Sequence, residues 1–388
     1  MMAVMTGASD RQGAAAPSPG EPLAPVELLD RLGIQAEVDP EPLAHNGWLT
    51  PGIWKVHTPD GAAVLKYLSA RRPRGQTAWE AHWTSGDHDP GRWNYWAREA
   101  LVYRDRLFEA FAGSGLGAPE PLAVEVADTD AVLLLAWQVG RPAEDWEAAD
   151  YAPTARALGR AQGPYLVNRA LPELGWLSRG FLRDYSSEKP VEWWVLEDDD
   201  AWAHPLARAA FPPDLRDRLR FMHDNRERLY RINEALPRTL CHLDFWTKNL
   251  IAAPGGETVV LDWAFFGLGA LGEDIGNLIP DAVFDLFLPA RFLPVLETAV
   301  FDAYEAGLRE SGWDGDIRLA RLGMWSSAVK YDWLGPATVI GAQTSDHLRY
   351  GGVESVDPVH KLSERAAGLL HLADWAEKAL ELAEGVGL

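Results

Sequence analysis

Cysteine and long apolar runs are nearly absent from this sequence. The single cysteine, Cys241, excludes an intramolecular disulfide framework and any metal site built from cysteines alone. A reducing cytoplasm is therefore the expected location. The longest apolar stretch, residues 131–137, is far too short to span a bilayer. Residues 1–25 are rich in Ala, Gly, Ser and Pro and lack the apolar run of a signal peptide, so we expect a disordered leader there.

Basic residues are also few in relation to acidic ones. The chain has 36 Lys and Arg against 57 Asp and Glu, a formal net charge of −21. Because nucleic-acid phosphates are bound by clustered Lys and Arg, this balance argues against a nucleic-acid partner. An acidic surface keeps a protein soluble, and it would also suit a cationic substrate. Composition leaves both interpretations open.

The first part of the chain is rich in strand patterns. Residues 52–57 and 62–68 flank a Pro-Asp-Gly turn and predict a hairpin. Residues 93–111 carry apolar side chains at helical spacing and predict a helix. Two further strand-like runs, 122–126 and 131–137, follow a stretch rich in Gly and Pro.

After residue 140 the pattern becomes helical. Apolar spacing predicts helices over residues 151–162, 214–235, 290–307, 317–333 and 361–382. One strand pair is expected around Asn249 and Asp262. The sequence thus predicts an α+β fold of two lobes with a ligand cleft between them. We expect a small antiparallel-sheet lobe with one helix at residues 26–138 and a larger helical lobe at residues 139–388; the motifs described next would make the first the nucleotide-binding lobe and the second the catalytic and substrate lobe.

The strongest chemical signal is the spacing H-x-D-x-x-x-x-N at His242, Asp244 and Asn249, followed by an apolar strand that ends at Asp262. Phosphoryl transfer needs a carboxylate that takes the proton of the attacking hydroxyl, and oxygen ligands that hold magnesium on the phosphates. Asp244 fits the first role, and Asn249 and Asp262 fit the second. Each residue alone is more often a turn or cap residue, so the ordered set predicts the catalytic centre.

This pattern, with Asp-Trp-Ala-Phe-Phe-Gly from Asp262 and Gly-Glu-Asp ending at Asp274, resembles the aminoglycoside phosphotransferase and choline kinase-like family. The resemblance implies a protein-kinase-like fold and a magnesium-dependent kinase that uses ATP or GTP. It implies that Asp244 is the base, that Asn249 and Asp262 bind the metal, and that His242 and Asp274 brace the loop. No Ala-Pro-Glu segment follows, so we expect no protein substrate.

If the resemblance holds, the first lobe must supply a lysine for the phosphates and a glutamate to hold it. Lys66 ends the apolar run Ala-Val-Leu-Lys, and Glu99 lies at the border of the apolar face of the next predicted helix. A carboxylate in that position requires a cation, and Lys66 is the natural one. The alternative for Lys66 is an ordinary exposed lysine at a strand end.

Two further nucleotide contacts are expected in this lobe. Gly47, Thr50 and Gly52 precede the first strand of the hairpin, where a phosphate-covering loop belongs. A tight turn without a ligand explains the same residues. The connector that includes Ala136 and Gln138 is expected to present backbone groups to the adenine, on the resemblance alone.

Three rival functions are weighed against the kinase. Residues 267–272 read G-x-G-x-x-G, a dinucleotide fingerprint, but no second strand ending in an acid follows, so these glycines are expected to shape the loop beyond Asp262. His242 and Asp244 could serve a metal-dependent hydrolase, although the other histidines are scattered. A catalytically inactive nucleotide-binding scaffold is the third alternative.

The acceptor is a small molecule in this interpretation. Asp281, Asp332 and Trp333 are expected near it, and they could bind an ammonium group by charge and cation–π contact, or serve as helix caps and core. The resemblance allows an aminoglycoside or other antibiotic, and alternatively a metabolic amino alcohol or a sugar. The net charge favours a cationic acceptor without deciding the matter.

Overall fold

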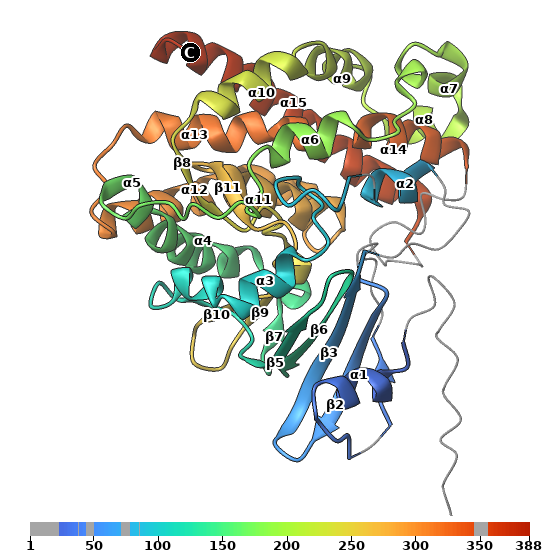
Figure 1. The fold of residues 1–388 in the computed structure, drawn as a ribbon. Coiled ribbons are helices and arrows are strands. Elements are labelled where there is room, and N and C mark those ends of the chain that lie inside the picture. Colours follow the sequence, from blue (N-terminus) through green and yellow to red (C-terminus); the bar gives the residue numbers. More distant parts are fainter. Residues whose placement is uncertain (1–22, 38, 44–49, 71–77, 85, 345–355) are drawn as a thin grey trace, which may run out of the picture.

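A small sheet-rich part and a larger helical part make up the molecule (Figure 1). This computed structural model describes residues 23–37, 39–43, 50–70, 78–84, 86–344 and 356–388. The strands are β1 (Glu41–Pro42), β2 (Gly52–Thr58), β3 (Gly61–Ser69), β4 (Leu116–Gly117), β5 (Pro121–Val126), β6 (Asp130–Ala136), β7 (Arg141–Pro142), β8 (Arg238–Cys241), β9 (Leu250–Ala252), β10 (Thr258–Val260) and β11 (Gly267–Ala270).

Helices form most of the rest. The α-helices are α1 (Pro25–Arg31), α2 (Ala78–Thr84), α3 (Arg98–Arg104), α4 (Ala148–Gln162), α5 (Pro164–Val167), α6 (Phe181–Ser187), α7 (Asp199–Ala203), α8 (Pro205–Ala210), α9 (Leu215–Asp224), α10 (Arg226–Ala235), α11 (Glu273–Phe284), α12 (Leu293–Glu310), α13 (Ile317–Ser326), α14 (Leu334–Gln343) and α15 (Pro358–Val386). The short 3-10 helices are η1 (Leu107–Phe111), η2 (Ala143–Asp145), η3 (Trp193–Leu196), η4 (Thr247–Asn249), η5 (Ala290–Phe292) and η6 (Ser327–Tyr331).

The sheet of the smaller part has the order β1-β2-β3-β6-β5, and every neighbouring pair is antiparallel. It contains all four strands that the sequence predicts, at nearly the predicted bounds. Helix α1 packs on this sheet through Leu28 and Leu29. Arg31 at its end lies 2.8 Å from Glu125 and 2.9 Å from Asp130, so ion pairs hold the helix on strands β5 and β6.

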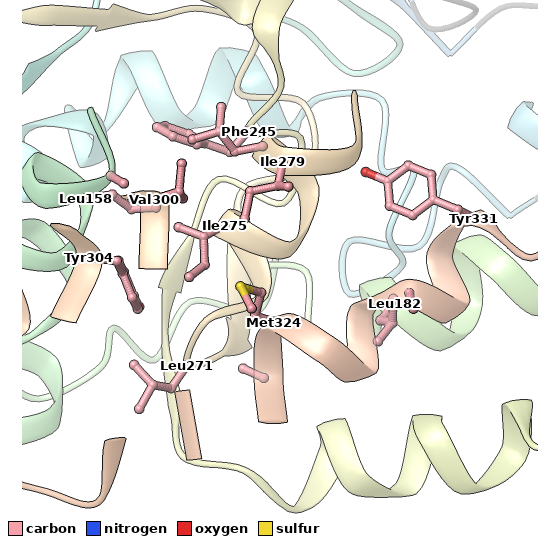
Figure 2. Close-up of a cluster of buried hydrophobic side chains, with 14 of the residues drawn as sticks. Leu158, Leu182, Phe245, Leu271, Ile275, Ile279, Val300, Tyr304, Met324 and Tyr331 are labelled. Carbon is pink, nitrogen blue, oxygen red and sulfur yellow. The ribbon is translucent and has the colours of Figure 1, made fainter. Parts of the chain in front are cut away.

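The core of the helical part surrounds α11. Figure 2 shows Ile275 and Ile279 of α11 near Met324 of α13, with Phe245 in the same cluster. Helix α11 is buried along almost its whole length, and polar side chains on it such as Asp274 and Asn277 are hydrogen-bonded inside the protein. Because Phe245 is fully buried there, the core anchors the loop that carries the neighbouring Asp244.

The helix expected over residues 93–111 is shorter than predicted. Helix α3 begins only at Arg98 and ends at Arg104, and the separate 3-10 helix η1 follows. The Arg98 guanidinium donates to the carbonyl oxygens of Trp93 at 2.6 Å and Pro90 at 3.2 Å. These carbonyls therefore face an arginine instead of a helical N–H. The apolar spacing reflects buried aromatic side chains in turns, a tertiary cause that the sequence does not show.

Two other predicted helices are interrupted. Residues 214–235 form α9 and α10, and at their junction Asn225 Nδ2 donates to Phe221 O at 2.8 Å. Residues 317–333 form α13 and then η6, where Ser327 Oγ donates to Gly323 O at 2.7 Å and competes with the helical ladder. The helices predicted at 151–162, 290–307 and 361–382 are confirmed with shifted ends as α4, α12 and α15.

The glycine-rich stretch that follows Asp262 is a strand, which corrects the expectation of a loop. Strand β11 pairs with β8 in antiparallel register, so the G-x-G-x-x-G pattern has a structural cause. A Cβ atom at Gly267 would collide with the backbone of Ser178. Gly272 has φ +93°, a left-handed conformation that glycine adopts without strain.

Two segments from the first part of the sequence lie with the helical part. Trp83 of α2 has its ring 5.7 Å from Tyr185 of α6 and 6.2 Å from Phe265, and Figure 1 shows α2 beside α6. Strand β4 pairs in parallel with β10 in the sheet β4-β10-β9-β7. Helix α2 and strand β4 therefore contact the helical part, although both come before residue 138 in the sequence.

Among the helices that the structure describes, none combines the length and the apolar character that a membrane crossing requires.

Candidate active site

Lys66 and Glu99 form a buried ion pair. Lys66 lies on β3 opposite Leu133 of β6, and Glu99 lies in the first turn of α3. Lys66 Nζ is 2.8 and 2.6 Å from the two carboxylate oxygens of Glu99, and the residues are only 6% and 2% exposed. Burial opposes the charge of the ammonium group, but Asp262 and Glu99 outweigh it and raise the pKa of Lys66. The structure thus brings together the pair that the sequence predicted.

Asp262 extends this pair toward solvent. Its Oδ1 lies 3.7 Å from Lys66 Nζ, and its side chain is 44% exposed. The residue has φ 55°, and Leu243, next to the predicted base, has φ 67°. Left-handed backbone is uncommon outside glycine and persists where the surrounding structure enforces it, often at functional sites.

Asp244 and Asn249 are joined through their side chains. Asn249 Nδ2 donates to Oδ2 and to the backbone oxygen of Asp244, each at 3.0 Å. Since both N–H groups point there, the Oδ1 atom of Asn249 remains as an oxygen ligand. Leu261 N donates to Asn249 O at 2.8 Å, which places the end of the β10 segment beside this loop. Burial raises the pKa of Asp244 to about 6, and the charge of Lys330 opposes this shift.

The donor set of Asn249 and Asp262 fits a magnesium ion. One amide oxygen and one carboxylate are hard ligands of the kind that Mg²⁺ accepts. Within the described parts of the chain, no group of three or more His, Cys, Asp or Glu side chains could hold a metal by itself. Magnesium usually keeps waters and takes phosphate oxygens as further ligands, so two protein ligands suffice.

Asp274 holds the turn that precedes the predicted base. Its Oδ2 accepts from the backbone N–H of His242 at 2.9 Å, and its Oδ1 accepts from that of Leu243 at 2.8 Å. Gln162 Nε2 donates to the same carboxylate at 2.8 Å, and the Tyr304 hydroxyl donates to Gln162 Oε1 at 2.5 Å. The position of Asp274 is that of a brace, as the family resemblance implied.

His242 also faces inward. The side chain is fully buried, and its Nε2 lies 2.9 Å from Leu261 O, across the loop. Burial lowers the pKa of His242 to about 4, so the imidazole is neutral near pH 7 and Nε2 donates its proton to that carbonyl oxygen. The histidine joins the loop to the strand segment that leads to Asp262.

Two lysines that the sequence analysis did not single out lie beside Asp244. Lys330 Nζ, on η6, is 4.0 Å from Asp244 Oδ1 and donates to Asn277 Oδ1 at 2.7 Å. Lys189 Nζ lies 3.7 Å from the centroid of the Tyr185 ring, and Lys330 Nζ lies 5.5 Å from the same centroid. Both lysines are 6% exposed. No motif marks them, because only the tertiary structure brings them to the loop.

Asp281, Asp332 and Trp333 lie on this same side of the site. Asp281 Oδ2 accepts from the Tyr331 hydroxyl at 3.0 Å, so part of its capacity is used within the protein. Asp332 is 3% exposed, and its Oδ1 has no hydrogen-bond partner among the described residues. The Trp333 ring centroid lies 3.9 Å from Lys189 Nζ. The tryptophan therefore contacts a cation, but that cation belongs to the protein.

The structure describes four of the five residues that the sequence analysis assigned to nucleotide contacts. Gly47 lies outside the described residues, whereas Thr50 is buried and Gly52 begins β2. The Ala136 N–H donates at 2.9 Å to the residue that precedes β5, and the Ala136 carbonyl accepts from Gln138 Nε2 at 2.9 Å. A base bound at this connector would therefore not use the Ala136 amide.

The family of the chain follows from a sequence comparison. The model of the phosphotransferase enzyme family matches residues 44–314. The chain belongs to this phosphotransferase family. The predicted enzyme class and the bilobal, protein-kinase-like α+β fold are thereby confirmed. The matched range contains Asp244, Asn249 and Asp262 but ends before Lys330 and Asp332.

Several solved phosphotransferases are similar to this chain in overall course. An amicoumacin kinase in complex with AMP-PNP and Ca²⁺ has 13% identity and a TM-score of 0.49, with 92% of this chain and 94% of the other covered. An aminoglycoside phosphotransferase from Streptomyces rimosus has 20% identity and a TM-score of 0.42, with 79% and 96% covered. A choline kinase from Streptococcus pneumoniae has 13% identity and a TM-score of 0.43, with 89% and 97% covered. Among the curated proteins, none matches the chain.

One more residue of this phosphotransferase was missed by sequence reasoning. Arg98, next to Glu99, is fully buried and donates to Trp176 O at 2.8 Å and Ala264 O at 3.0 Å. Burial lowers the pKa of Arg98 to about 9. Because Ala264 lies two residues after Asp262, this guanidinium ties helix α3 to the segment that carries the predicted metal ligand. An arginine beside the predicted glutamate was the only signal in the sequence.

Proposed function

We propose that this phosphotransferase moves the γ-phosphoryl group of ATP, or of GTP, to a hydroxyl group of a small molecule. The observation that carries the proposal is the Asp244 carboxylate, which is held by Asn249 and lies in a loop hydrogen-bonded to the segment that ends at Asp262. On the other side of that segment stands the Lys66–Glu99 pair. These are the groups that phosphoryl transfer requires.

In this proposal each side chain has a defined task. Asp244 orients the acceptor hydroxyl and takes its proton as the oxygen attacks the γ-phosphorus. The bond from that phosphorus to the β–γ bridging oxygen breaks, and the nucleoside diphosphate leaves with the bridging oxygen. Lys66, held by Glu99, neutralises negative charge on the phosphates.

Asn249 Oδ1 and Asp262 would hold a magnesium ion, which supplies charge neutralisation on the phosphate oxygens when bound. Gly47, Thr50, Gly52, Ala136 and Gln138 remain the proposed surroundings of the nucleotide. His242 and Asp274 are proposed to position the loop and not to contact substrate, since both face the interior.

The proposed setting is the cytoplasm, where ATP is available and the buried thiol of Cys241 stays reduced. A small-molecule acceptor is favoured over a protein or nucleic acid, because no Ala-Pro-Glu segment follows Asp262 and the chain is strongly acidic. An aminoglycoside or another antibiotic, a metabolic amino alcohol and a sugar all fit this reaction.

The test is magnesium-dependent ADP release from ATP in the presence of acceptors, with Asp244→Asn as the blank. The panel contains aminoglycosides, other antibiotics, amino alcohols, hydroxy acids and sugars. Release that requires an acceptor and disappears in the blank supports the kinase. Release without any acceptor would indicate a hydrolase, and nucleotide binding without release would indicate a scaffold.

A further inference from the structure

Lys189 has an unusual environment for a buried lysine. Its ammonium lies between the rings of Tyr185 and Trp333, 3.7 and 3.9 Å from their centroids. Among the described residues, none provides a hydrogen-bond acceptor or a carboxylate within ion-pair distance of Lys189 Nζ, although the residue is only 6% exposed. Ring faces attract a cation but accept its N–H groups poorly, so up to three strong donors remain unused.

This ammonium belongs to the same site as the predicted base. Lys330 faces the Tyr185 ring as well, and its Nζ lies 4.0 Å from Asp244 Oδ1. Both lysines therefore lie next to the Tyr185 ring, and one of them, Lys330, is also close to Asp244. The family match covers Lys189 and Tyr185 and ends before Lys330.

A second cation, Lys330, lies near enough to Lys189 to act on its charge. Burial lowers the pKa of Lys189 well below its ordinary value, and Lys330 lowers it further, while Asp332, Asp281 and Asp244 oppose both effects. An anion between the two lysines would relieve this repulsion and satisfy the free donors.

The nearby carboxyl groups are poorly suited to bind a cationic acceptor. Burial raises the pKa of Asp281 and of Asp332 to about 7 each, so both carry only part of their charge at neutral pH. Asp281 already accepts from Asn277 and Tyr331. An acceptor ammonium bound here would also be repelled by the ammonium groups of Lys189 and Lys330.

Resting on the proposed kinase function, we propose that the acceptor carries an acid group, a carboxylate or a phosphate, that binds between Lys189 and Lys330 while its hydroxyl group reaches Asp244. The net charge of the whole protein suggested the opposite sign, but recognition depends on the groups that touch the ligand. Lys189 is thus a specificity residue and Asp244 the catalytic one.

The test uses sets of small alcohols that share one carbon skeleton and differ in one group: carboxylate, phosphate monoester, primary amide or primary amine. Binding to the full chain is measured by calorimetry with magnesium and a non-hydrolysable ATP analogue, so that no turnover is needed. Lys189→Met and Lys189→Gln remove the charge at similar volume, and thermal unfolding verifies that both variants fold. Lys378→Met is the matched control, because Lys378 of α15 also faces a tryptophan ring, that of Trp325 at 5.7 Å.

We expect one of the two acid members to bind at least about tenfold more tightly than the amide, and both Lys189 variants to lose about 10- to 100-fold of that affinity. The amide should bind the variants and the wild type alike, and Lys378→Met should behave as wild type. Preference for carboxylate over phosphate, or the reverse, identifies the anion.

Tightest binding of the amine, equal binding of acid and amide, no acid binding, or acid binding that ignores Lys189 would each overturn the inference. Transfer assays on the same sets separate this failure from that of the proposed function. Asp244-dependent transfer to an amine or a neutral acceptor leaves the kinase standing and removes only the acid-binding role. Acid binding without any ATP-dependent transfer would support the acid-binding role of Lys189 and contradict the proposed kinase function.

Discussion

Asp244 owes its chemistry to the side chains around it. Its carboxylate is partly buried, accepts from Asn249 Nδ2 at 3.0 Å and faces the ammonium of Lys330 at 4.0 Å. These contacts set the direction of the carboxylate, and a well-placed base contributes about 10²- to 10⁴-fold to a rate. Asp244 is proposed to face the reacting groups, whereas His242, two residues earlier, faces the interior of the protein.

We therefore expect Asp244→Asn to lower the rate of transfer by about 10²- to 10⁴-fold, because the amide cannot take the hydroxyl proton. Nucleotide affinity should stay within a factor of about two, since Lys66 and the metal ligands are unchanged. Single-turnover kinetics and equilibrium binding of an ATP analogue measure the two quantities. Near wild-type transfer by the variant would show that another group is the base.

A second expectation concerns the Lys66–Glu99 pair. Lys66→Met should weaken nucleotide binding and slow transfer together, because the cation on the phosphates is lost. Glu99→Gln should slow transfer less, since the lysine remains, although a neutral amide replaces the carboxylate whose oxygens lie 2.6 and 2.8 Å from its ammonium. Steady-state kinetics at varied ATP concentrations compare the variants. Wild-type kinetic constants in both variants would contradict the role assigned to the pair.

At the scale of elements, helix α3 is positioned by a single arginine. Arg98 donates to backbone oxygens of the segments before α3, and also to Trp176 O and Ala264 O. The helix carries Glu99, and Ala264 follows Asp262, so one guanidinium fixes the distance between two parts of the candidate site. No carboxylate is paired with it among the described residues, and backbone carbonyls satisfy the buried charge.

Arg98→Met should destabilise the protein by about 3–5 kcal/mol, because several buried carbonyl oxygens lose their donors at once. The matched control is Arg104→Met on the same helix, where Arg104 is 49% exposed and pairs with Asp105 at the surface. That change should cost no more than about 1 kcal/mol. Urea unfolding compares the two variants, and similar losses in both would refute the role given to Arg98.

At the scale of the whole molecule, helices far apart in sequence are joined by buried polar groups. Glu297 of α12 accepts from Trp325 Nε1 of α13 at 3.0 Å and from Trp375 Nε1 of α15 at 2.8 Å. His371 Nε2 of α15 lies 3.0 Å from the same carboxylate. Burial opposes the charge of Glu297, but these hydrogen bonds outweigh it and lower its pKa to about 2.

The contribution of the Glu297 carboxylate to the free energy of unfolding depends on pH. In the folded protein Glu297 stays ionised down to about pH 2, whereas its ordinary pKa is 4.5. Its contribution is therefore complete above about pH 4.5 and is lost as the pH falls toward 2. Glu297→Gln should reduce the free energy of unfolding by about 1–3 kcal/mol at pH 7, with a shrinking difference below pH 4.5.

Denaturant unfolding at several pH values measures this difference. Glu305→Gln is the control on the same helix, because Glu305 is one-third exposed and, among the described residues, pairs only with Arg309 at 3.2 Å. It should change the stability little at any pH. A loss for Glu297→Gln that is the same at pH 7 and pH 3 would show that the hydrogen bonds do not depend on the charge.

The sequence by itself determined the family and the α+β fold class, and it predicted the central residues of the candidate site. Asp244 and Asn249 are close in the chain, and the Asn249 carbonyl accepts from Leu261, so local loop geometry already brings three predicted groups together. The Lys66–Glu99 pair could also be predicted, because the sequence places a lysine at the end of an apolar run and a glutamate at the border of an apolar helix face, and each needs an opposite charge.

Only the tertiary structure decided what surrounds these residues. Arg98 and Lys189 have no spacing that distinguishes them from surface cations, and Lys330 meets Asp244 only after η6 is placed against the loop. Helix breaks such as that at Asn225 were hidden for the same reason, since the apolar period runs through them. Burial and charge in a site depend on contacts between distant segments, and a linear pattern records which residues exist but not which of them meet.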